Sequence, residues 1–178
     1  MKKKILLVLL FVIVKVEAQT STFSVADSLF AKGRYKLALK ELDKSEASFL
    51  TNYKKAVIYE SIDDYKKAAQ FLEKAVTFKD DENAKLRLAK NYRSLKLSKK
   101  AIPIYEEVLA KDSLNLVLKY QLGKLYIINR KPKEAIKTFK YLVKNDEENA
   151  NYSYHLGLSY ALNGERDPMM NSFLDTHE

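Results

Sequence analysis

The residues that could do acid–base or metal chemistry are few in this sequence. It has two histidines and no cysteine. His155 lies next to a Leu-Gly pair that is typical of helix packing, and His177 stands at the extreme end. The sequence contains no zinc-protease pattern, no nucleophile elbow and no glycine-rich phosphate loop. We therefore expect no catalytic residue, no metal site, no cofactor and no enzymatic activity.

Acidic residues gather in three short clusters, at residues 63–64, 80–82 and 146–148. A calcium loop would need alternating acidic residues and a glycine in one segment, and none of the clusters has both. Each cluster falls at a predicted turn between helices. An acidic side chain there favours the N-terminus of the following helix. The clusters are thus interpreted as helix-start residues and not as ligands.

A repeated pattern carries more information than these polar residues. The pattern Leu-Gly-x-x-Tyr at 122–126 recurs 34 residues later at 156–160. Ala135 and Phe139 repeat Ala101 and Tyr105 at the same offset. A fixed period of this size is typical of stacked helix-turn-helix units.

Each unit pairs a small residue with a large apolar one on the same helical face. In the second helices the large residue follows an alanine by four positions: Ala38 and Leu42, Ala68 and Leu72, Ala101 and Tyr105, Ala135 and Phe139. In the first helices it follows by three: Ala26 and Leu29, Ala56 and Tyr59, Ala89 and Tyr92, Gly123 and Tyr126, Gly157 and Tyr160. A small residue lets two helix axes approach, and the large residue fills the space one turn away. Gly123 and Gly157 should be required by packing, because glycine inside a helix costs roughly 1 kcal/mol relative to alanine.

These residues resemble the tetratricopeptide repeat (TPR) family. The segments Gly33-Arg34-Tyr35 and Asp64-Tyr65 resemble its turn between helices, and the resemblance covers about residues 21–176. It implies an all-α fold, a right-handed α-α solenoid of about five repeats, at 20–48, 49–81, 82–114, 115–147 and 148–178. The predicted helices lie near 22–32, 35–46, 50–61, 65–77, 83–95, 98–110, 115–128, 132–145, 149–162 and 166–176.

Several positions depart from the family pattern. The first interval, from Ala38 to Ala68, is only 30 residues, which suggests a tighter loop around residues 45–50. Pro103 lies inside a second helix and is expected to kink it mildly. Met169 replaces the alanine in the fifth repeat. No capping helix follows Phe173, and we expect the chain to be a fragment of a longer array, the alternative being a poorly capped last helix.

The N-terminus has the features of a cleavable signal peptide at residues 1–18. Three lysines precede the unbroken apolar run 5–14, and Val16-Glu17-Ala18 offers a peptidase site. An uncleaved membrane anchor and a buried helix are the alternatives. The run is short of the roughly 20 residues needed to span a bilayer. We expect an exported bacterial protein, periplasmic or secreted, whose repeat domain at 19–178 does not insert into a membrane.

The net charge of +9 falls to +6 when the signal is removed, since the signal holds four lysines and one glutamate. A charge of this size is typical of a solvated surface, and it also attracts acidic partners. Because the chain is expected to be exported, nucleic acid is not an expected partner.

The resemblance implies an inner, concave face lined by the first helix of each repeat. Residues three before its small residue face the groove, namely Phe23, Tyr53, Leu86, Tyr120 and Tyr154. So do residues one after it, namely Asp27, Val57, Lys90, Lys124 and Leu158, with Arg93 on the same side. We expect the partner to contact Tyr53, Val57, Lys90, Arg93, Tyr120, Lys124, Tyr154 and Leu158. The alternative is that the aromatic residues only pack against neighbouring helices.

Together these features predict a non-enzymatic scaffold of the cell envelope that binds a partner protein or peptide in the groove. The alternative is a sensory or regulatory ectodomain that precedes a membrane helix and a signalling domain. One TPR subclass clamps a partner's C-terminal carboxylate with lysines and asparagines. The asparagines that this clamp needs one residue after the small residue are absent here.

Overall fold

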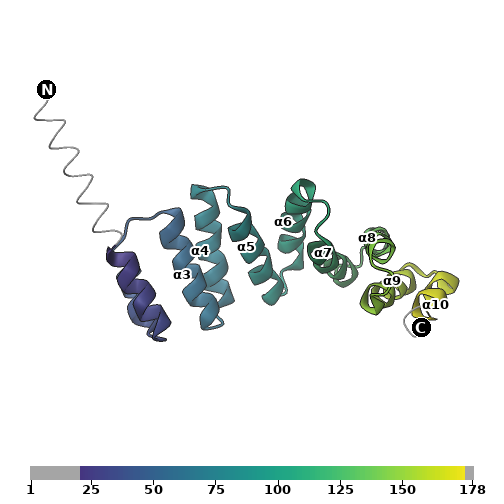
Figure 1. Ribbon diagram of the computed structural model, residues 1–178, viewed down its shortest axis with the longest axis horizontal. Helices are drawn as coiled ribbons and strands as arrows, with labels where there is room; N and C mark the ends of the chain where they lie inside the picture. The colour runs from purple at the N-terminus through teal and green to yellow at the C-terminus, as the bar shows by residue number, and fades with distance from the viewer. Residues whose placement is uncertain (1–20, 175–178) are drawn as a thin grey trace, which may run out of the picture. The chain divides into compact units, whose positions relative to one another are not determined.

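The computed structural model describes residues 21–174, and every regular element in this range is a helix (Figure 1). The first helix covers residues 21–31. The others are α2 (Tyr35–Leu42), α3 (Phe49–Ser61), α4 (Tyr65–Phe78), α5 (Glu82–Ser94), α6 (Ser98–Lys111), α7 (Leu116–Ile128), α8 (Pro132–Asn145), α9 (Ala150–Asn163) and α10 (Arg166–Leu174). The predicted signal peptide at 1–18 lies outside the described residues. No helix within residues 21–174 has both the length and the apolar character to cross a bilayer.

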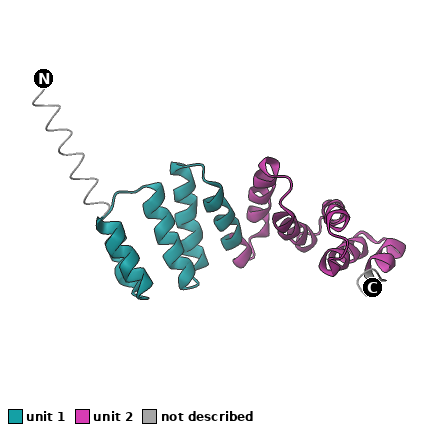
Figure 2. Cartoon of the chain, viewed as in Figure 1, with its two compact units in different colours: residues 1–91 teal, residues 92–178 magenta. Residues whose placement is uncertain are grey.

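The helices group into two compact units (Figure 2). Unit 1 ends at Asn91 and unit 2 begins at Tyr92, so the boundary falls within α5. In unit 1, α3 and α4 form a closely packed hairpin. In unit 2, α7 packs on α8, α8 on α9, and α9 on α10. Helices that are consecutive in the chain are thus neighbours within each unit, as expected for helical repeats.

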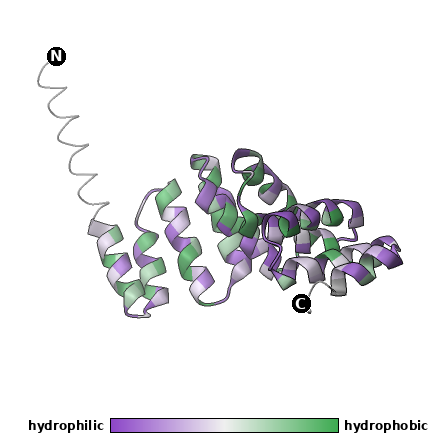
Figure 3. Ribbon diagram, turned by 45° about the vertical axis from the view of Figure 1, so that its right-hand side comes forward, coloured by the Kyte–Doolittle hydropathy of each residue, from purple (hydrophilic) through white to green (hydrophobic). Residues whose placement is uncertain are grey.

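The core of each unit includes most of the predicted small and large residues. Ala38, Ala68, Ala101 and Ala135 are fully buried, as are their partners Leu42, Leu72 and Phe139. Apolar and polar residues alternate along the helices, as the changing colours of Figure 3 show, and the two kinds separate onto opposite sides most clearly in α2, α4 and α8. The predicted phase of the repeat is therefore confirmed. Packing of this amphipathic face, rather than intrinsic helix propensity, supplies most of the helix stability.

The turn between the two helices of each repeat has the same backbone geometry in all five cases. One residue in each turn has positive φ: Gly33, Asp63, Lys96, Arg130 and Gly164. The next N–H donates to the carbonyl of the large residue of the first helix, as from Lys131 to Tyr126 at 2.9 Å. This pattern is the Schellman ending of an α-helix. Glycine adopts positive φ without strain, whereas the three other side chains adopt it at an energetic cost.

The prediction of a tighter loop in the first repeat was wrong. α2 has only 8 residues, against 14 in each of α4, α6 and α8. The segment that follows α2, residues 43–48, is longer than the three-residue segment 79–81 after α4. The helix predicted at 35–46 thus ends at Leu42, where Ser45 N–H turns back to the Leu42 carbonyl at 3.2 Å. The shortened interval comes from the lost helical turns and not from the loop.

Acidic residues begin two helices, as predicted. The Asp64 side chain accepts a hydrogen bond from Lys67 N–H at 3.0 Å at the start of α4. Asp81 accepts from Ala84 N–H at 3.0 Å at the start of α5. Both carboxylates satisfy N–H groups that have no partner inside the helix.

α6 continues through Pro103 from Ser98 to Lys111.

Candidate protein-binding surfaces

Unit 1 has an apolar pocket between the first helix, α2 and α3. Its volume is about 270 Å³, and two predicted contact residues, Tyr53 and Val57, line it. Asp27, another residue carried over from the family, stands in the lining and forms an ion pair with Lys54 at 2.6 Å. The charge of this pocket is thus balanced within the chain, and its apolar lining suits an apolar side chain of a partner.

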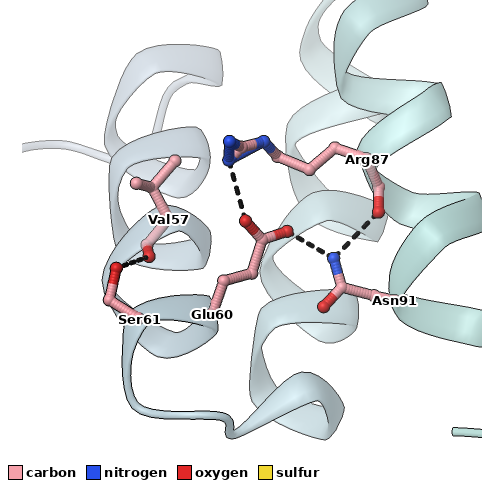
Figure 4. A network of polar contacts seen from close by, with 5 residues as sticks. All are labelled: Val57, Glu60, Ser61, Arg87 and Asn91. Atoms are coloured by element: carbon pink, nitrogen blue, oxygen red, sulfur yellow. Dashed lines mark hydrogen bonds and ion pairs between the residues drawn. The ribbon is translucent and has the colours of Figure 1, made fainter. Parts of the chain in front are cut away.

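Next to this pocket, a polar network links α3 and α5 (Figure 4). Glu60 accepts from Arg87 at 2.8 Å and also from the amide of Asn91, which is 1% exposed. Arg87 lies 5.5 Å from the ring centroid of Tyr53. The second amide atom of Asn91, Oδ1, is buried and has no hydrogen-bond partner among the described residues. This network neutralises the arginine and positions it over the tyrosine ring.

Unit 2 brings aromatic rings together around Tyr120 on α7. The Tyr120 ring centroid lies 5.4 Å from that of Tyr152, 5.2 Å from that of His155 and 6.1 Å from that of Phe139. The His155 ring also stacks on Phe139 at 5.3 Å. Rings at these separations stabilise one another beyond the burial of their surface. The cluster therefore fixes α7, α8 and α9 against each other.

Two cations border this aromatic cluster. Lys124 Nζ lies 4.6 Å from the Tyr120 ring centroid. Arg93 on α5 donates a hydrogen bond to the side-chain oxygen of Gln121 on α7. Burial lowers the pKa of Lys124, and the positive charge of Arg93 lowers it further. The two cations thus act on each other electrostatically, and we call Arg93, Gln121, Tyr120 and Lys124 the cationic surface.

His155 is a packing residue in the structure, as the sequence indicated. Its Nδ1 lies 2.7 Å from the Asn151 carbonyl oxygen of the preceding turn. Burial lowers its pKa, the Asn151 hydrogen bond opposes this effect, and Lys124 adds a smaller lowering. A histidine held neutral among aromatic rings contributes to packing.

The predicted contact residues are distributed over both units. Arg93, Tyr120 and Lys124 come together in the cationic surface, and Tyr154 extends from α9, 48% exposed, with its ring against His155. Tyr53 and Val57 line the pocket of unit 1. Lys90 is exposed on α5, and Leu158 is half-buried on α9. Tyr120 contacts three neighbouring rings, as the packing alternative expects, and its half-buried ring also lies beside Lys124 on the cationic surface.

The sequence did not indicate which side chains contact the predicted binding residues in the fold. Glu60, Gln121 and Tyr152 were not singled out, although each contacts a predicted residue or its neighbour. Spacing could have found Gln121, because it lies two residues before Gly123 on the side of α7 that meets α5. The contact of Tyr152 with Tyr120 joins different repeats, and no single-helix pattern predicts it.

Unit 2 also has a cavity, of about 480 Å³, which lies between α6, α7 and α8. Tyr126 in its lining donates a hydrogen bond to Glu106 at 2.7 Å. Burial raises the pKa of Tyr126, and the bond to Glu106 raises it further. The phenol is thus held in its neutral form. Across residues 21–174, no three histidine or acidic side chains are placed to hold a metal ion.

Comparison with known proteins identifies the repeats. Residues 50–82 and residues 120–167 each match the tetratricopeptide repeat family. None of the curated proteins matches the sequence. The family is one of protein–protein interaction scaffolds that are typically non-enzymatic, in agreement with the expectation that the chain is not an enzyme.

Solved structures show the same fold. MamA has a TM-score of 0.75 at 20% identity, over 90% of this chain and 90% of that one. YrrB, described as a TPR protein with an unusual peptide-binding site, has a TM-score of 0.73 at 20% identity, over 88% of this chain and 84% of that one. MamA from Desulfovibrio magneticus RS-1, residues 41 to the end, has a TM-score of 0.72 at 19% identity, over 89% and 93%. The predicted fold class, an all-α solenoid of helix-turn-helix repeats, is therefore confirmed, and the chain contains tetratricopeptide repeats at residues 50–82 and 120–167.

Proposed function

We propose that this protein is an exported scaffold of the bacterial cell envelope, periplasmic or secreted, that holds a partner protein or peptide against the first helices of its repeats. The proposal of export rests on the lysines, the apolar run and the peptidase site at residues 1–18. The proposal of binding rests on the repeat family and on the surfaces of the two units. Preformed helices lose little conformational freedom when they bind, so most of the contact energy is retained as affinity.

One observation supports the binding proposal most strongly. Arg93, Tyr120 and Lys124 lie at predicted contact positions and gather on one surface of unit 2. Arginine and tyrosine are the residue types that most often dominate interface energies. Unit 1 offers a second, apolar contact in the pocket that Tyr53 and Val57 line.

The binding proposal is tested by partner capture from envelope and secreted fractions. The double variant Arg93→Gln/Lys124→Gln removes two positive charges from the cationic surface, and Lys99→Gln/Lys133→Gln removes two from exposed positions elsewhere. We expect the first variant to lose a partner that the wild type and the control variant both retain. A partner retained equally by all three proteins would contradict a binding role for this surface.

Export is tested on the protein from its own host. Fractionation should place it outside the cytosol, and mass spectrometry of the intact chain should give a mature N-terminus at Gln19. A cytosolic protein that retains residues 1–18 would contradict the proposed location. The binding proposal would then be tested on cytosolic partners instead.

A further inference from the structure

The charge on the cationic surface of unit 2 is not balanced within the described chain. Cations that link neighbouring helices in unit 1 are paired with carboxylates, as Lys54 is with Asp27 at 2.6 Å and Lys55 with Asp43 at 2.7 Å. No carboxylate among residues 21–174 forms an ion pair with Arg93 or Lys124. This surface of unit 2 thus holds two positive charges that have no ion-pair partner among the described residues, whereas the corresponding cations of unit 1 are neutralised.

The difference comes from substitutions at two equivalent repeat positions. In unit 1, Glu60 stands four residues after its small residue and pairs with Arg87, which stands two residues before the next small residue. The same two positions in unit 2 hold Arg93 and Gln121. The interhelical contact is therefore kept, but the arginine now stands where unit 1 has the glutamate, and its partner on the next helix is a neutral amide. Gln121 orients the guanidinium without neutralising it, and a guanidinium has further N–H groups to donate.

Burial makes this unbalanced charge costly for the free protein. Lys124 is half-buried, its Nζ lies 4.6 Å from the Tyr120 ring centroid, and burial and Arg93 both lower its pKa. An anion placed near Lys124 and Arg93 would offset the repulsion and would accept bidentate hydrogen bonds from the guanidinium. The exposed ring of Tyr154 extends from the same unit and offers an apolar contact.

We infer that unit 2 docks an acidic segment of the partner protein, with carboxylate side chains on Arg93 and Lys124 and apolar side chains against Tyr120 and Tyr154. This inference rests on the proposed binding function and specifies the chemistry of the partner. The positive charges of Arg93 and Lys124 favour carboxylates in the partner segment. The aromatic rings favour apolar residues between those carboxylates. Because the surface is partly exposed, salt should weaken the binding.

The test uses two probes and one isosteric variant. The first probe is a hexapeptide of alternating aspartate and phenylalanine, acetylated and amidated at its ends, and the second has asparagine in place of aspartate. Gln121→Glu gives Arg93 an internal carboxylate, as Glu60 gives Arg87, with no change of shape. Gln70→Glu, on the exposed side of α4, makes the same change of net charge elsewhere. Binding is measured by fluorescence anisotropy of the labelled probes at low and physiological salt.

We expect the aspartate probe to bind the wild type and Gln70→Glu equally, and to bind Gln121→Glu at least ten times more weakly. The asparagine probe should bind the wild type at least ten times more weakly than the aspartate probe. Equal binding of both probes, or unchanged binding by Gln121→Glu, would overturn the inference. If a native partner is captured equally by the wild type and by Gln121→Glu, the protein still binds a partner, as the proposed scaffold function requires. That result would contradict only the inference that the docked segment is acidic.

Discussion

The ring of Phe139 on α8 occupies the place where a side chain on Gly123 of α7 would begin. A Cβ added to Gly123 would lie 2.8 Å from both Cε2 and Cζ of that ring, and 3.2 Å from Cγ2 of Thr138. Phe139 is fully buried, so its ring has little room to move. The glycine of the Leu-Gly-x-x-Tyr pattern at 122–126 is thus required because α8 packs directly on it.

Gly123→Ala should therefore destabilise the protein. Alanine favours the helix by roughly 1 kcal/mol over glycine, but overpacking against a rigid ring costs about 1–3 kcal/mol. We expect a lower midpoint in urea denaturation, and a larger loss for Gly123→Leu. In the double variant Gly123→Ala/Phe139→Leu the two effects should be less than additive, because the smaller side chain makes room. A Gly123→Ala protein more stable than the wild type would contradict the close approach.

The small–large packing could be predicted from the sequence because it depends on side-chain size at fixed helical spacing. The positions of Ala38, Ala101 and Phe139 follow from that spacing, and all three are buried as expected. The length of α2 could not be predicted, because residues 43–46 have no strong helix-breaking signal, yet the helix ends at Leu42. The missing carboxylate beside Arg93 could not be predicted either, because it depends on which residue of α7 contacts Arg93, and that residue is Gln121.

The turn residues with positive φ give a second prediction. Arg130 has a φ of +53° and is exposed, so Arg130→Gly should relieve strain and stabilise the protein by about 1 kcal/mol. Gly33 has a φ of +70° with open space around it, so Gly33→Ala should destabilise for conformational reasons alone. Thermal unfolding measures both changes. If Arg130→Gly lowers the melting temperature, the turn geometry assigned to this repeat is wrong.

His155 predicts a pH dependence of stability. Burial lowers its pKa below the value of about 6.5 expected in the unfolded chain. The unfolded state therefore binds more protons between the two pKa values, and stability is complete above about pH 6.5 and is lost as the pH falls below it. His155→Phe keeps the contact with Phe139 and cannot be protonated. Between pH 7.5 and pH 5 the melting temperature of the wild type should fall more than that of His155→Phe, and equal declines would exclude this role.

The hydrogen bonds of Glu60 with Arg87 and Asn91 predict how the protein responds when the Asn91 amide is replaced by a carboxylate of nearly the same shape. Asn91→Asp would place a buried carboxylate where the amide now donates to Glu60, so the protein should lose about 3 kcal/mol of stability at neutral pH. The loss should shrink as the pH is lowered and the carboxylates are protonated. Asn83→Asp, exposed in the first turn of the same helix, is the matched control and should be neutral or slightly stabilising. Chemical denaturation at two pH values separates the two variants, and equal stabilities would show that Asn91 is not held as described.

The most direct measurement of the central claim is site-specific photo-crosslinking in living cells. Benzoyl-phenylalanine would replace Tyr154, which is 48% exposed beside the aromatic cluster, or Phe78, which is 54% exposed at the end of α4 in unit 1. We expect a partner protein to be crosslinked from position 154 and not from position 78, and the crosslink to weaken in the Arg93→Gln/Lys124→Gln background. A partner crosslinked from position 78 and absent from position 154 would contradict the account.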